Sequence, residues 1–528
     1  MARLTYLLAA LVLIPFNYAH ALQINQQGAD TLKASFQDLL DYQKTVNDAL
    51  GSVRIEYKGD LTVKQEATYY AVTFPHVFIR GPKIEGVPDD NTVFDMGVIK
   101  INAIPDDKPG YWKTVMTFPS KMTLKGEKPE DNFSINFADQ KSIALFSERL
   151  GYFTKLDMNL SGISFQAAGQ DVGVNIGGLQ GYMKFEEKDD GTFSGPGHVL
   201  LTNLNIAPPT EAEKFNVGEF KADFSMQDMK MPTLKEYQAK LMKHAETFES
   251  LQSLGTPEEE AQMDGNAILN MMMDLYNFDM NGFTFEYSAK DINVSSDLEN
   301  QFRDFDTLQI GSASLGFGFQ NLKSEKGTMA IKSTYDTVKM TPIDPEYKDV
   351  IPQKMNMNIQ ALNIPYGALT QIATNTAKAI ATDPESAQMA GLGVLMRLPA
   401  ILAQAGTQIV VEKNGASNST YDFGIGGKVM TDLSAMSGFT AQFNALFEGL
   451  DALHAIAKKN AANTNSANSG QFAQMAASLE SLKAVGKAQK GPNGKPAYAY
   501  DIQANAQGQF LVNGQDAATV FSPAPPPQ

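Results

Sequence analysis

The spacing of apolar residues changes near residue 50 from a helical to a strand period. Between Ala29 and Leu50 the apolar positions recur mostly every three or four residues, which predicts one amphipathic helix. From residue 52 onward apolar and polar residues largely alternate, in short stretches rich in β-branched and aromatic residues. Turn signals such as 88–90 and 105–107 separate these stretches. Short strands without helices between them indicate antiparallel β structure.

A second pattern recurs after residue 155. Two alternating apolar residues are followed by two polar positions and then by two further alternating apolar residues. Because side chains alternate with a period of two, the paired polar positions switch the buried side of the strand. Such a switch occurs at a β-bulge or where a strand crosses a bend in its sheet. The pattern, which predicts long strands that change phase midway in a curved sheet, is found at 158–165, 199–206, 224–231, 278–285 and 357–364.

The stretch at 224–231 places Met226, Met229 and Met231 close together in the chain. Closely spaced thioether sulfurs are soft ligands of the kind that bind copper(I). In the matching stretch 357–364 the same positions hold isoleucine or leucine, so the methionines also fit as apolar positions of a strand. Alternation predicts that Met226 faces away from the other two. We favour packing in the core over metal binding.

Helical segments interrupt the strands, mostly in pairs. Thr233 and Glu236 form a capping box at the start of a helix that is expected to end at Gly255. A second helix begins at Thr256 and continues to about Tyr276. Further helices are predicted at 366–382, 384–405, 440–458 and 471–487, and further strands at 407–413, at 419–430 and in a C-terminal hairpin.

These patterns predict an α+β protein that is mainly antiparallel β, with long curved sheets and helical hairpins packed against them. A chain of 528 residues exceeds what one hydrophobic core normally organises. The expected segments are a signal peptide at 1–21, a helix and antiparallel β region at 22–230, a helical hairpin at 231–277, a β region at 278–365, a C-terminal α+β region at 366–521 and a Pro-rich tail at 522–528.

The N-terminal residues follow the pattern of a secretory signal. Arg3 gives a positive start, a short apolar core follows, and Ala19-His20-Ala21 supplies a small-residue cleavage site. The apolar run is shorter than the ~20 residues that a membrane-spanning helix needs. The sequence therefore predicts cleavage after Ala21 and a periplasmic or secreted protein.

The amino-acid composition excludes several kinds of site and of binding partner. The chain has no cysteine, which excludes disulfides and thiolate metal sites. Asp and Glu outnumber Lys and Arg by 59 to 43, giving a formal net charge of −16. Because an acidic surface repels nucleic acid, we exclude nucleic-acid binding.

The sequence lacks the common motifs of catalysis and cofactor binding. The histidines after residue 21 are isolated, and no serine lies in G-x-S-x-G or S-x-x-K. The stretch 486–495 resembles a phosphate loop but has Pro492 where a lysine is required. Asp189, Asp190 and Gly191 fit a hairpin turn better than a calcium loop. We predict no catalytic, cofactor or metal site. A catalytic pair of carboxylates can come from positions far apart in the chain, so a hydrolase remains an alternative.

The segment 389–406 is apolar on almost every side, with Arg397 as its single charge. A helix of this kind is either deeply buried or in contact with lipid or another protein. Burial is the simpler interpretation. The alternative makes the helix a contact site for a hydrophobic ligand or partner, formed by Leu392, Leu395, Met396, Leu398 and Ile401.

The C-terminal third ends in a helix, a strand, a glycine turn at Gly508 and the sequence Val512-Asn513-Gly514, and earlier strands end in LNIP and MKMP. In these features it resembles the YdgA-like family of bacterial envelope proteins, from which it departs in its cleavable signal. The resemblance implies no established activity and no catalytic residues. The long curved sheets also resemble those of AsmA-like proteins, which implies a role in envelope and lipid homeostasis.

The function that we expect from these observations is non-catalytic. It is the binding or passing of a lipid or other hydrophobic envelope component, or scaffolding at the membrane face, with contact to a peripheral membrane or envelope protein as a further expectation. A secreted hydrolase with dispersed carboxylates and a structural or adhesin-like interaction protein remain as alternatives. An apolar trough open along the sheet favours lipid, whereas a compact cleft with converging carboxylates favours an enzyme.

The signal pattern predicts that the mature chain begins at Leu22, because cleavage follows the small residue Ala21. N-terminal sequencing of the exported protein measures this directly. Recovery of a chain with intact Met1 in the membrane pellet would contradict both the cleavage and the periplasmic location.

Overall fold

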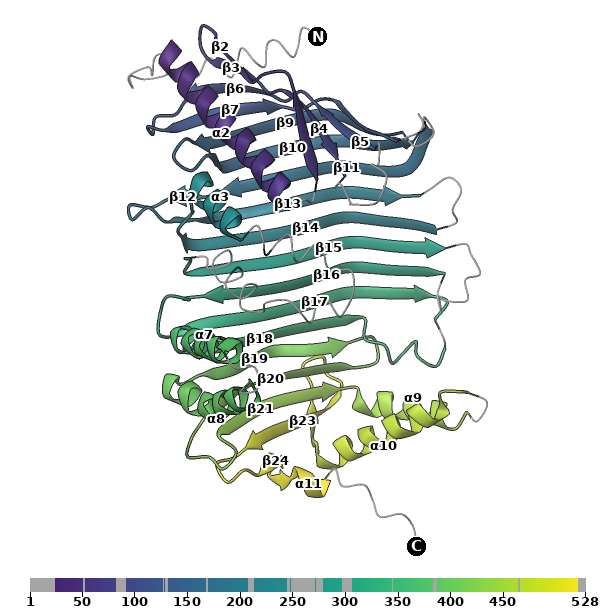
Figure 1. Ribbon diagram of the computed structural model, residues 1–528. Coiled ribbons are helices and arrows are strands. Elements are labelled where there is room, and N and C mark those ends of the chain that lie inside the picture. Colours follow the sequence, from purple (N-terminus) through teal and green to yellow (C-terminus); the bar gives the residue numbers. More distant parts are fainter. Residues whose placement is uncertain are drawn as a thin grey trace. The chain divides into compact units, whose positions relative to one another are not determined.

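A computed structural model describes residues 24–50, 53–81, 92–126, 128, 132–167, 170–207, 213–244, 247, 271, 279–296, 306–343, 345–382, 387–463 and 466–520. The predicted signal peptide, the Pro-rich tail and, apart from Met271, the predicted helix at 256–276 lie outside these residues. In these described residues the chain is mainly antiparallel β, with 25 strands in one hydrogen-bonded network (Figure 1). The predicted fold class, α+β with helical hairpins on a curved and mainly antiparallel sheet, is therefore confirmed.

The chain divides into two units. The first comprises Met1–Asn132, Gln140–Met158 and Pro232–Ala245, and the second comprises Phe133–Asp139, Asn159–Met231 and Glu246–Gln528. Two long strands, β9 (Phe133–Ser147) and β10 (Tyr152–Ala167), contribute residues to both units. The division between the units therefore falls within these two strands.

The first unit combines helix α2 (Gln26–Leu50) with two antiparallel ladders. One ladder joins, in this order, β2 (Thr62–Gln65), β3 (Tyr70–Thr73), β6 (Lys100–Pro105), β7 (Tyr111–Thr117) and β9. The other joins β1 (Arg54–Lys58), β4 (His76–Arg80), β5 (Val93–Gly97) and β8 (Lys121–Lys125). The strands predicted between residues 52 and 118 are thus present.

The core of the first unit forms where α2 packs on these strands. Leu32 and Phe36 of α2 are fully buried, and the Phe36 ring lies 4.8 Å from that of Phe146. Tyr70 holds the start of the helix, because its hydroxyl donates to the Asn25 carbonyl at 3.0 Å and accepts from the Asn25 N–H at 2.9 Å. The apolar side predicted for this helix is therefore its buried side.

Helix α3 (Leu234–Lys243) begins at the predicted capping box. The Thr233 side chain accepts from the Glu236 N–H at 3.2 Å, and the Glu236 carboxylate accepts from the Thr233 N–H at 2.7 Å. These two bonds satisfy backbone donors that the first turn of a helix leaves free. Leu234 and Leu241 are the buried residues of this helix.

The second unit is built on a run of antiparallel strands, each paired with the next along the sheet (Figure 1). In sheet order the strands are β11 (Gln170–Lys184), β13 (Phe193–Ile206), β14 (Glu213–Met229), β15 (Gly282–Ser296), β16 (Thr307–Gln320), β17 (Gly327–Thr341), β18 (Lys354–Ile364), β19 (Gln408–Ser417), β20 (Asp422–Thr431), β21 (Phe439–Glu448) and β23 (Pro496–Ala504). Shorter strands extend this sheet, namely β12 (Glu186–Glu187), β22 (Lys487–Lys490), β24 (Phe510–Val512) and β25 (Gln515–Asp516).

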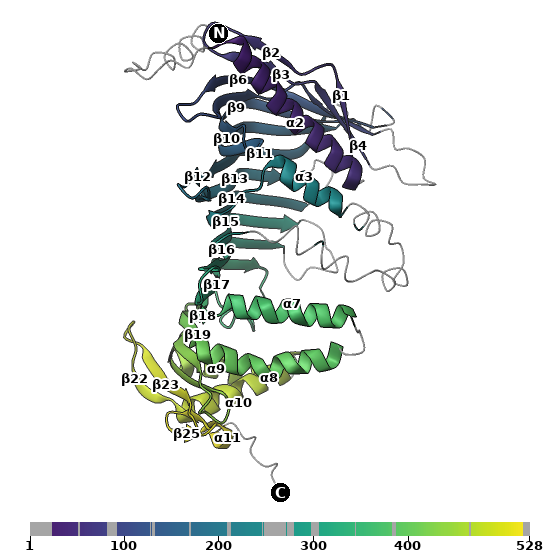
Figure 2. The same cartoon turned by 60° about the vertical axis from the view of Figure 1, so that its left-hand side comes forward.

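Five helices of the second unit have bounds within the described residues, and all of them follow its later strands. They are α7 (Tyr366–Thr382), α8 (Ala387–Ala405), α9 (Leu450–Ala461), α10 (Ser469–Val485) and α11 (Ala517–Val520). Figure 2, which views this sheet nearer to its edge, shows α7 and α8 side by side on one side of the strands. The helices predicted at 366–382 and 384–405 and the strands predicted between 407 and 430 are confirmed.

A line of left-handed residues crosses the sheet of the second unit. Asn203, Asp291 and Thr337 lie in the middle of β13, β15 and β17 with φ of 52°, 53° and 61°. The ladders keep the same register on both sides of this line, so the strands bend there without an inserted residue. Each left-handed residue packs against a glycine on a neighbouring strand, because an added Cβ would lie within about 3 Å of it; these glycines are Gly177, Gly218 and Gly311.

The phase change predicted from the sequence coincides with left-handed residues in three of the five stretches. They are Gly162 in 158–165, Asn203 in 199–206 and Asp228 in 224–231, each at the second of the paired polar positions. The prediction is wrong for 278–285, since β15 begins only at Gly282. It is also wrong for 357–364, where the left-handed residue is Asn363, near the end of β18.

At Asp228 the strand is bulged, and this corrects the predicted orientation of the methionines. Met226 pairs with Gly195 and Met229 with Phe193, so two residues of β14, Gln227 and Asp228, lie opposite the single residue Ser194 of β13. Because Phe193 and Gly195 are two apart on one strand, Met226 and Met229 face the same side. Met229 is buried and Met226 lies opposite Phe283, as expected for packing residues.

The helix predicted at 440–458 is wrong in its first half. Residues Phe439–Glu448 form strand β21, Gly449 follows in a left-handed conformation at φ 75°, and α9 begins at Leu450. Phe443 and Phe447 are four residues apart, a spacing that fits the same face of either a helix or a strand. Pairing with β20 and β23 on both sides decides for the strand.

The bend predicts opposite effects on stability for a substitution at a left-handed residue and for one at the glycine packed against it. A β-branched residue at φ 61° is strained, so Thr337→Asn is expected to raise the free energy of unfolding by about 1 kcal/mol. Gly311→Ala is expected to lower it by roughly 1 kcal/mol, because the new Cβ meets Thr337 Cβ at 3.0 Å. Denaturant midpoints followed by circular dichroism measure both. Two variants that unfold like the wild type would contradict a strained, closely packed bend.

Candidate functional site

The sheet of the second unit has one apolar and one polar face. Directly opposite residues on paired strands point to the same face, so the register defines rows that run across the strands. One row, which we call the apolar row, comprises Leu201, Phe220, Ala289, Ala313, Tyr335, Met355, Ala416, Phe423 and Phe447. The adjacent row on the opposite face comprises Leu200, Lys221, Ser288, Ser314, Thr334, Asn356, Gly415, Gly424 and Leu446.

Part of the apolar face is open to solvent. Large side chains on β13, β14, β15 and β16 are between 39% and 51% exposed, namely Val199, Phe220, Tyr287, Leu315 and Phe317. Close to them Phe319 contacts Tyr366, the first residue of α7, with ring centroids 6.2 Å apart, so α7 begins at this apolar face. Contiguous exposed apolar side chains of this kind mark a surface for binding rather than a solvated face.

At its C-terminal end the apolar face forms the floor of a cavity of about 660 Å³. Phe423, Ile425 and Phe447 of the sheet lie on one side of the cavity, and Leu453 of α9 with Leu479 and Leu482 of α10 lies on the other. The remaining lining is also apolar, apart from tyrosine hydroxyls. The volume is in the range of ~300–1,000 Å³ that is typical of small-molecule sites.

The two helices over the cavity are held by their packing and by a neighbouring loop. Leu450 is fully buried and Leu453 nearly so, which fixes α9 on the strands. The Glu346 carboxylate accepts from Asn463 Nδ2 at 3.0 Å and from Ser466 Oγ at 2.5 Å, in the connection between α9 and α10. Val350 of the same loop lines the cavity. The loop therefore keeps the helical cover closed over the apolar face.

A cluster of charged and polar side chains joins α9, α10 and β23 on the outer side of the two helices. Lys483 Nζ lies 2.5 Å from Asp451 Oδ1, and the Tyr498 hydroxyl donates to the same carboxylate at 3.2 Å. The hydrogen bond from Lys483 is the main cause that holds the pKa of Asp451 below its ordinary value. The Asp451 carboxylate in turn raises the pKa of Lys483. Both groups are partly exposed, so the pair orients the helices more than it stabilises them.

Tyr500 places one polar group at the cavity wall. Its ring lines the cavity, and its hydroxyl donates to the Leu482 carbonyl of α10 at 3.1 Å. Burial, together with the nearby Tyr498, raises the pKa of Tyr500 to about 12. The Tyr500 hydroxyl thus stays neutral and hydrogen-bonded to α10 at physiological pH.

The stretch that resembled a phosphate loop binds a carboxylate of the protein itself. Glu448 is 2% exposed, and Asn493 donates to its two oxygens from the backbone N–H at 3.0 Å and from Nδ2 at 2.7 Å. Gly491 is required there, because an added Cβ would meet Glu448 Oε1. The loop between β22 and β23 is therefore occupied by an internal anion and has a structural role.

The contact residues predicted on α8 do not line the cavity. Leu392 and Met396 are 54% and 83% exposed, while Leu398 and Ile401 are half-buried. The side chain of Leu395 lies outside the described residues. The interpretation that α8 is simply buried is thus wrong for the part of the helix that contains Leu392 and Met396. The structure brings together instead the residues of β20, β21, β23, α9 and α10, which the sequence reasoning missed because it treated 440–458 as one helix.

No described group of three or more His, Cys, Asp or Glu side chains is placed to hold a metal ion. The histidines are separate from one another. His76 bonds to Asp95 at 2.5 Å, His198 stacks on Tyr182, and His244 and His454 are buried on helices or at a helix end. These surroundings are structural.

The polar face carries two open grooves, of about 1160 and 540 Å³. In the smaller groove Asp223 and Glu286 lie directly opposite each other on β14 and β15, beside His198. Asp223 is 43% exposed and pairs with Lys221 at 2.8 Å. A catalytic pair of carboxylates needs a partly buried site that sets the two groups apart, whereas the side chains of Asp223 and Glu286 are both open to solvent. The groove does not favour a hydrolase.

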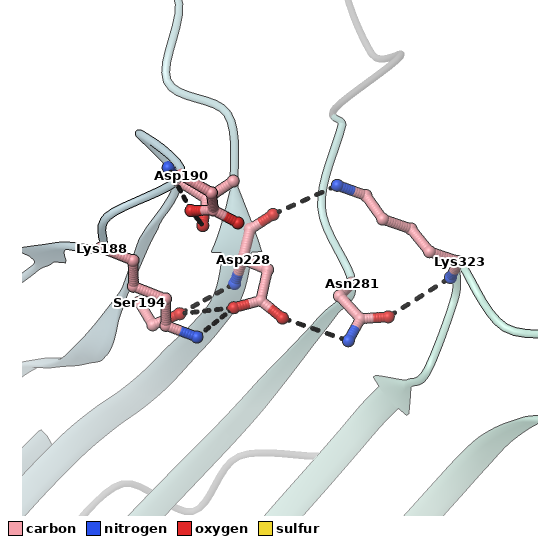
Figure 3. Close-up of polar contacts among 7 residues, drawn as sticks. Lys188, Asp190, Ser194, Asp228, Asn281 and Lys323 are labelled. Carbon is pink, nitrogen blue, oxygen red and sulfur yellow. Dashed lines mark hydrogen bonds and ion pairs between the residues drawn. The ribbon is translucent and has the colours of Figure 1, made fainter.

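A polar cluster surrounds the bulge at Asp228 (Figure 3). The Asp228 carboxylate accepts from Lys188 Nζ, from Ser194 Oγ at 3.2 Å and from Asn281 Nδ2 at 3.2 Å. The bond from Lys188 is the main cause that lowers the pKa of Asp228, and Lys323 Nζ donates to the Asp228 carbonyl at 3.4 Å. Since the protein's own lysines and amides surround the carboxylate, the cluster stabilises the bulge.

Comparisons with protein-family models, with curated proteins and with solved structures found no match for this chain. Within the described part of the chain, none of the helices combines the length and the apolar character that crossing a membrane requires. The fold and the geometry of the cavity are therefore the basis for any functional conclusion.

The pKa of Tyr500 predicts a loss of stability at high pH. Because its pKa rises from 10.0 to about 12 on folding, the neutral form favours the folded state below pH 10, and this contribution is lost as the pH rises from 10 to about 12. Tyr500→Phe is expected to unfold about 1 kcal/mol more easily at neutral pH, through loss of the bond to Leu482.

The same variant should lose less stability than the wild type between pH 9 and about pH 11.5. Denaturant midpoints at the two pH values measure the difference. Equal losses in both proteins would show that Tyr500 is not held neutral by the cavity wall.

Proposed function

We propose that this protein is an exported, non-catalytic envelope protein that binds a lipid or another hydrophobic component in the cavity beneath α9 and α10. The observation that carries the proposal is the cavity itself, which has about 660 Å³ and an almost wholly apolar lining. Burial of an acyl chain there is favourable by ~0.8 kcal/mol for each methylene group removed from water.

The open apolar face supports the passing of such a component as well as its binding. The apolar row runs from the cavity residues Phe447, Phe423 and Ala416 to Phe220, which is 40% exposed. A ligand with an acyl chain therefore finds apolar side chains along one face of this sheet. The same face carries the half-exposed residues Val199, Tyr287 and Leu315.

Charge and polarity agree with a neutral, apolar ligand. The net charge of −16 disfavours anionic partners such as nucleic acid. Polar groups near the cavity, such as Tyr500 and the Asp451–Lys483 pair, are bonded within the protein. The resemblance of the C-terminal third to YdgA-like envelope proteins, and of the sheet to AsmA-like proteins, supports the same class of function and an envelope location.

The exposed residues of α8 belong to the proposal as a second contact surface. Leu392 and Met396 are exposed on a helix whose only charge is Arg397. We propose that α8 contacts the hydrophobic component or a peripheral membrane or envelope protein through Leu392, Leu395, Met396, Leu398 and Ile401.

The cavity predicts that filling it will displace the ligand. Ala445 is buried on β21 and lines the cavity, so Ala445→Leu is expected to weaken binding of a neutral probe, the methyl ester of a dansyl-labelled fatty acid, by about tenfold or more. The matched control is Ala499→Leu on the neighbouring β23, which adds the same atoms on the polar face. Fluorescence titration measures both, and denaturant midpoints confirm that both variants are folded.

Equal affinity in the two variants, or no binding by the wild type, would refute the cavity as the ligand site. The same titration on Leu398→Asp tests the contribution of α8, which is expected to lower affinity while far-ultraviolet dichroism is unchanged. A Leu398→Asp variant that unfolds would place α8 in the core and remove it from the site.

A further inference from the structure

Two loops at the C-terminal end of the second unit expose large apolar side chains. One is 432–438, between β20 and β21, and the other is 505–510, which follows β23 and includes Phe510, the first residue of β24; together they are called the apolar tip. Leu433, Met436 and Phe510 of the tip are 61%, 84% and 53% exposed. The loops touch, since the Met436 N–H donates to the Ala506 carbonyl at 2.8 Å.

The exposed side chains of the tip are held by ordered turns. In the first loop the Asp432 carboxylate accepts from the N–H and the hydroxyl of Ser434 at 2.8 and 2.6 Å, and Ala435 is buried. In the second, the Asn505 side chain accepts from the Gln509 N–H at 3.0 Å. The ordered backbone therefore holds Leu433 and Met436 exposed to solvent in a defined position. Exposure of large apolar side chains to water is unfavourable, and a surface without a binding role does not need it.

The tip is almost without charge in a strongly acidic chain. Asp432 is its only ionisable residue, and its carboxylate is bonded to Ser434. Two loop ends are too small for a stable protein interface, which buries at least ~1,200 Å² and has a polar rim with hydrogen bonds. A bilayer accepts isolated apolar side chains without needing either.

The tip is also continuous with the cavity. Phe510 is exposed at the tip and at the same time lines the cavity, together with the next residues Leu511 and Val512. The Phe510 ring lies 6.4 Å from that of Phe439, at the base of the first loop. Phe510 therefore joins the exposed tip to the apolar lining of the cavity.

We infer that the apolar tip inserts into the surface of a lipid bilayer with neutral headgroups and places the mouth of the cavity at the membrane. This inference rests on the proposed function for what enters the cavity. Each methylene group of an acyl chain that is exposed to water during transfer lowers the equilibrium constant about fourfold. A cavity mouth within the bilayer avoids this exposure. The net charge of −16 predicts weaker docking on anionic bilayers.

The test uses the double variant Leu433→Ser with Met436→Ser, since neither residue lines the cavity. The matched control is Ile104→Ser with Met242→Ser, which removes two exposed apolar side chains of the first unit that belong to no proposed site. Flotation with phosphatidylcholine vesicles measures docking, and titration with the methyl ester of a dansyl-labelled fatty acid, kept monomeric below the concentration at which it aggregates, measures binding in the cavity. The tip variant is expected to lose flotation by about tenfold or more while its affinity for the monomeric probe is unchanged.

The possible results separate the two proposals. A wild type that does not float, a tip variant that floats as well as the wild type, or a control that loses as much flotation as the tip variant would overturn docking through the tip. A wild type that dimerises through the tip, seen as a monomeric tip variant in analytical ultracentrifugation, would also overturn it. Flotation that depends on the tip, in a protein that binds no probe, would support docking and refute the proposed cavity function alone.

Discussion

The antiparallel register across the second unit is the constraint on which the other features depend. Directly opposite residues share a face, so the pairs from β13 to β21 align Phe220, Tyr335, Phe423 and Phe447 in one row. The register shifts in the pairings β17–β18, β18–β19 and β19–β20 lie outside the pairs of this row. A shift by one residue in any pair would move apolar side chains to the polar face beyond it. The bend at Asn203, Asp291 and Thr337 keeps that register because it turns the strands without inserting a residue.

A sheet with one apolar face must bury that face or use it. In this chain α9 and α10 cover its C-terminal end, where Leu450 and Leu453 are buried. The contacts that hold the cover are mostly at its edges, as with Glu346 at the connection of the helices and Asp451 with Lys483 at their outer side. Because polar contacts lie outside and the helices do not meet the strands everywhere, an apolar space remains between them. The proposed binding of a hydrophobic component follows from this incomplete cover.

The sequence predicted elements well where one periodicity dominated. The capping box of Thr233 and Glu236, helix α2 and the alternating strands of the first unit depend on neighbours in the chain, and they are present as predicted. The error at 440–458 arose because Phe443 and Phe447 satisfy both periods. The cavity could not be predicted, since its lining comes from β20, β21, β23, α9 and α10, and its existence depends on how the helices rest on the strands.

The sequence by itself determined the antiparallel β character, the helical hairpins and the absence of disulfides, because these depend on local periodicity and composition. It also marked Gly162, Asn203 and Asp228, since paired polar positions interrupt the alternation there. Only the tertiary structure decided that Met226 and Met229 share a face, that Met396 is exposed and that Glu448 occupies the loop at Gly491. These properties depend on which distant strand or loop lies opposite, and long-range pairing leaves no trace in the local pattern of one chain.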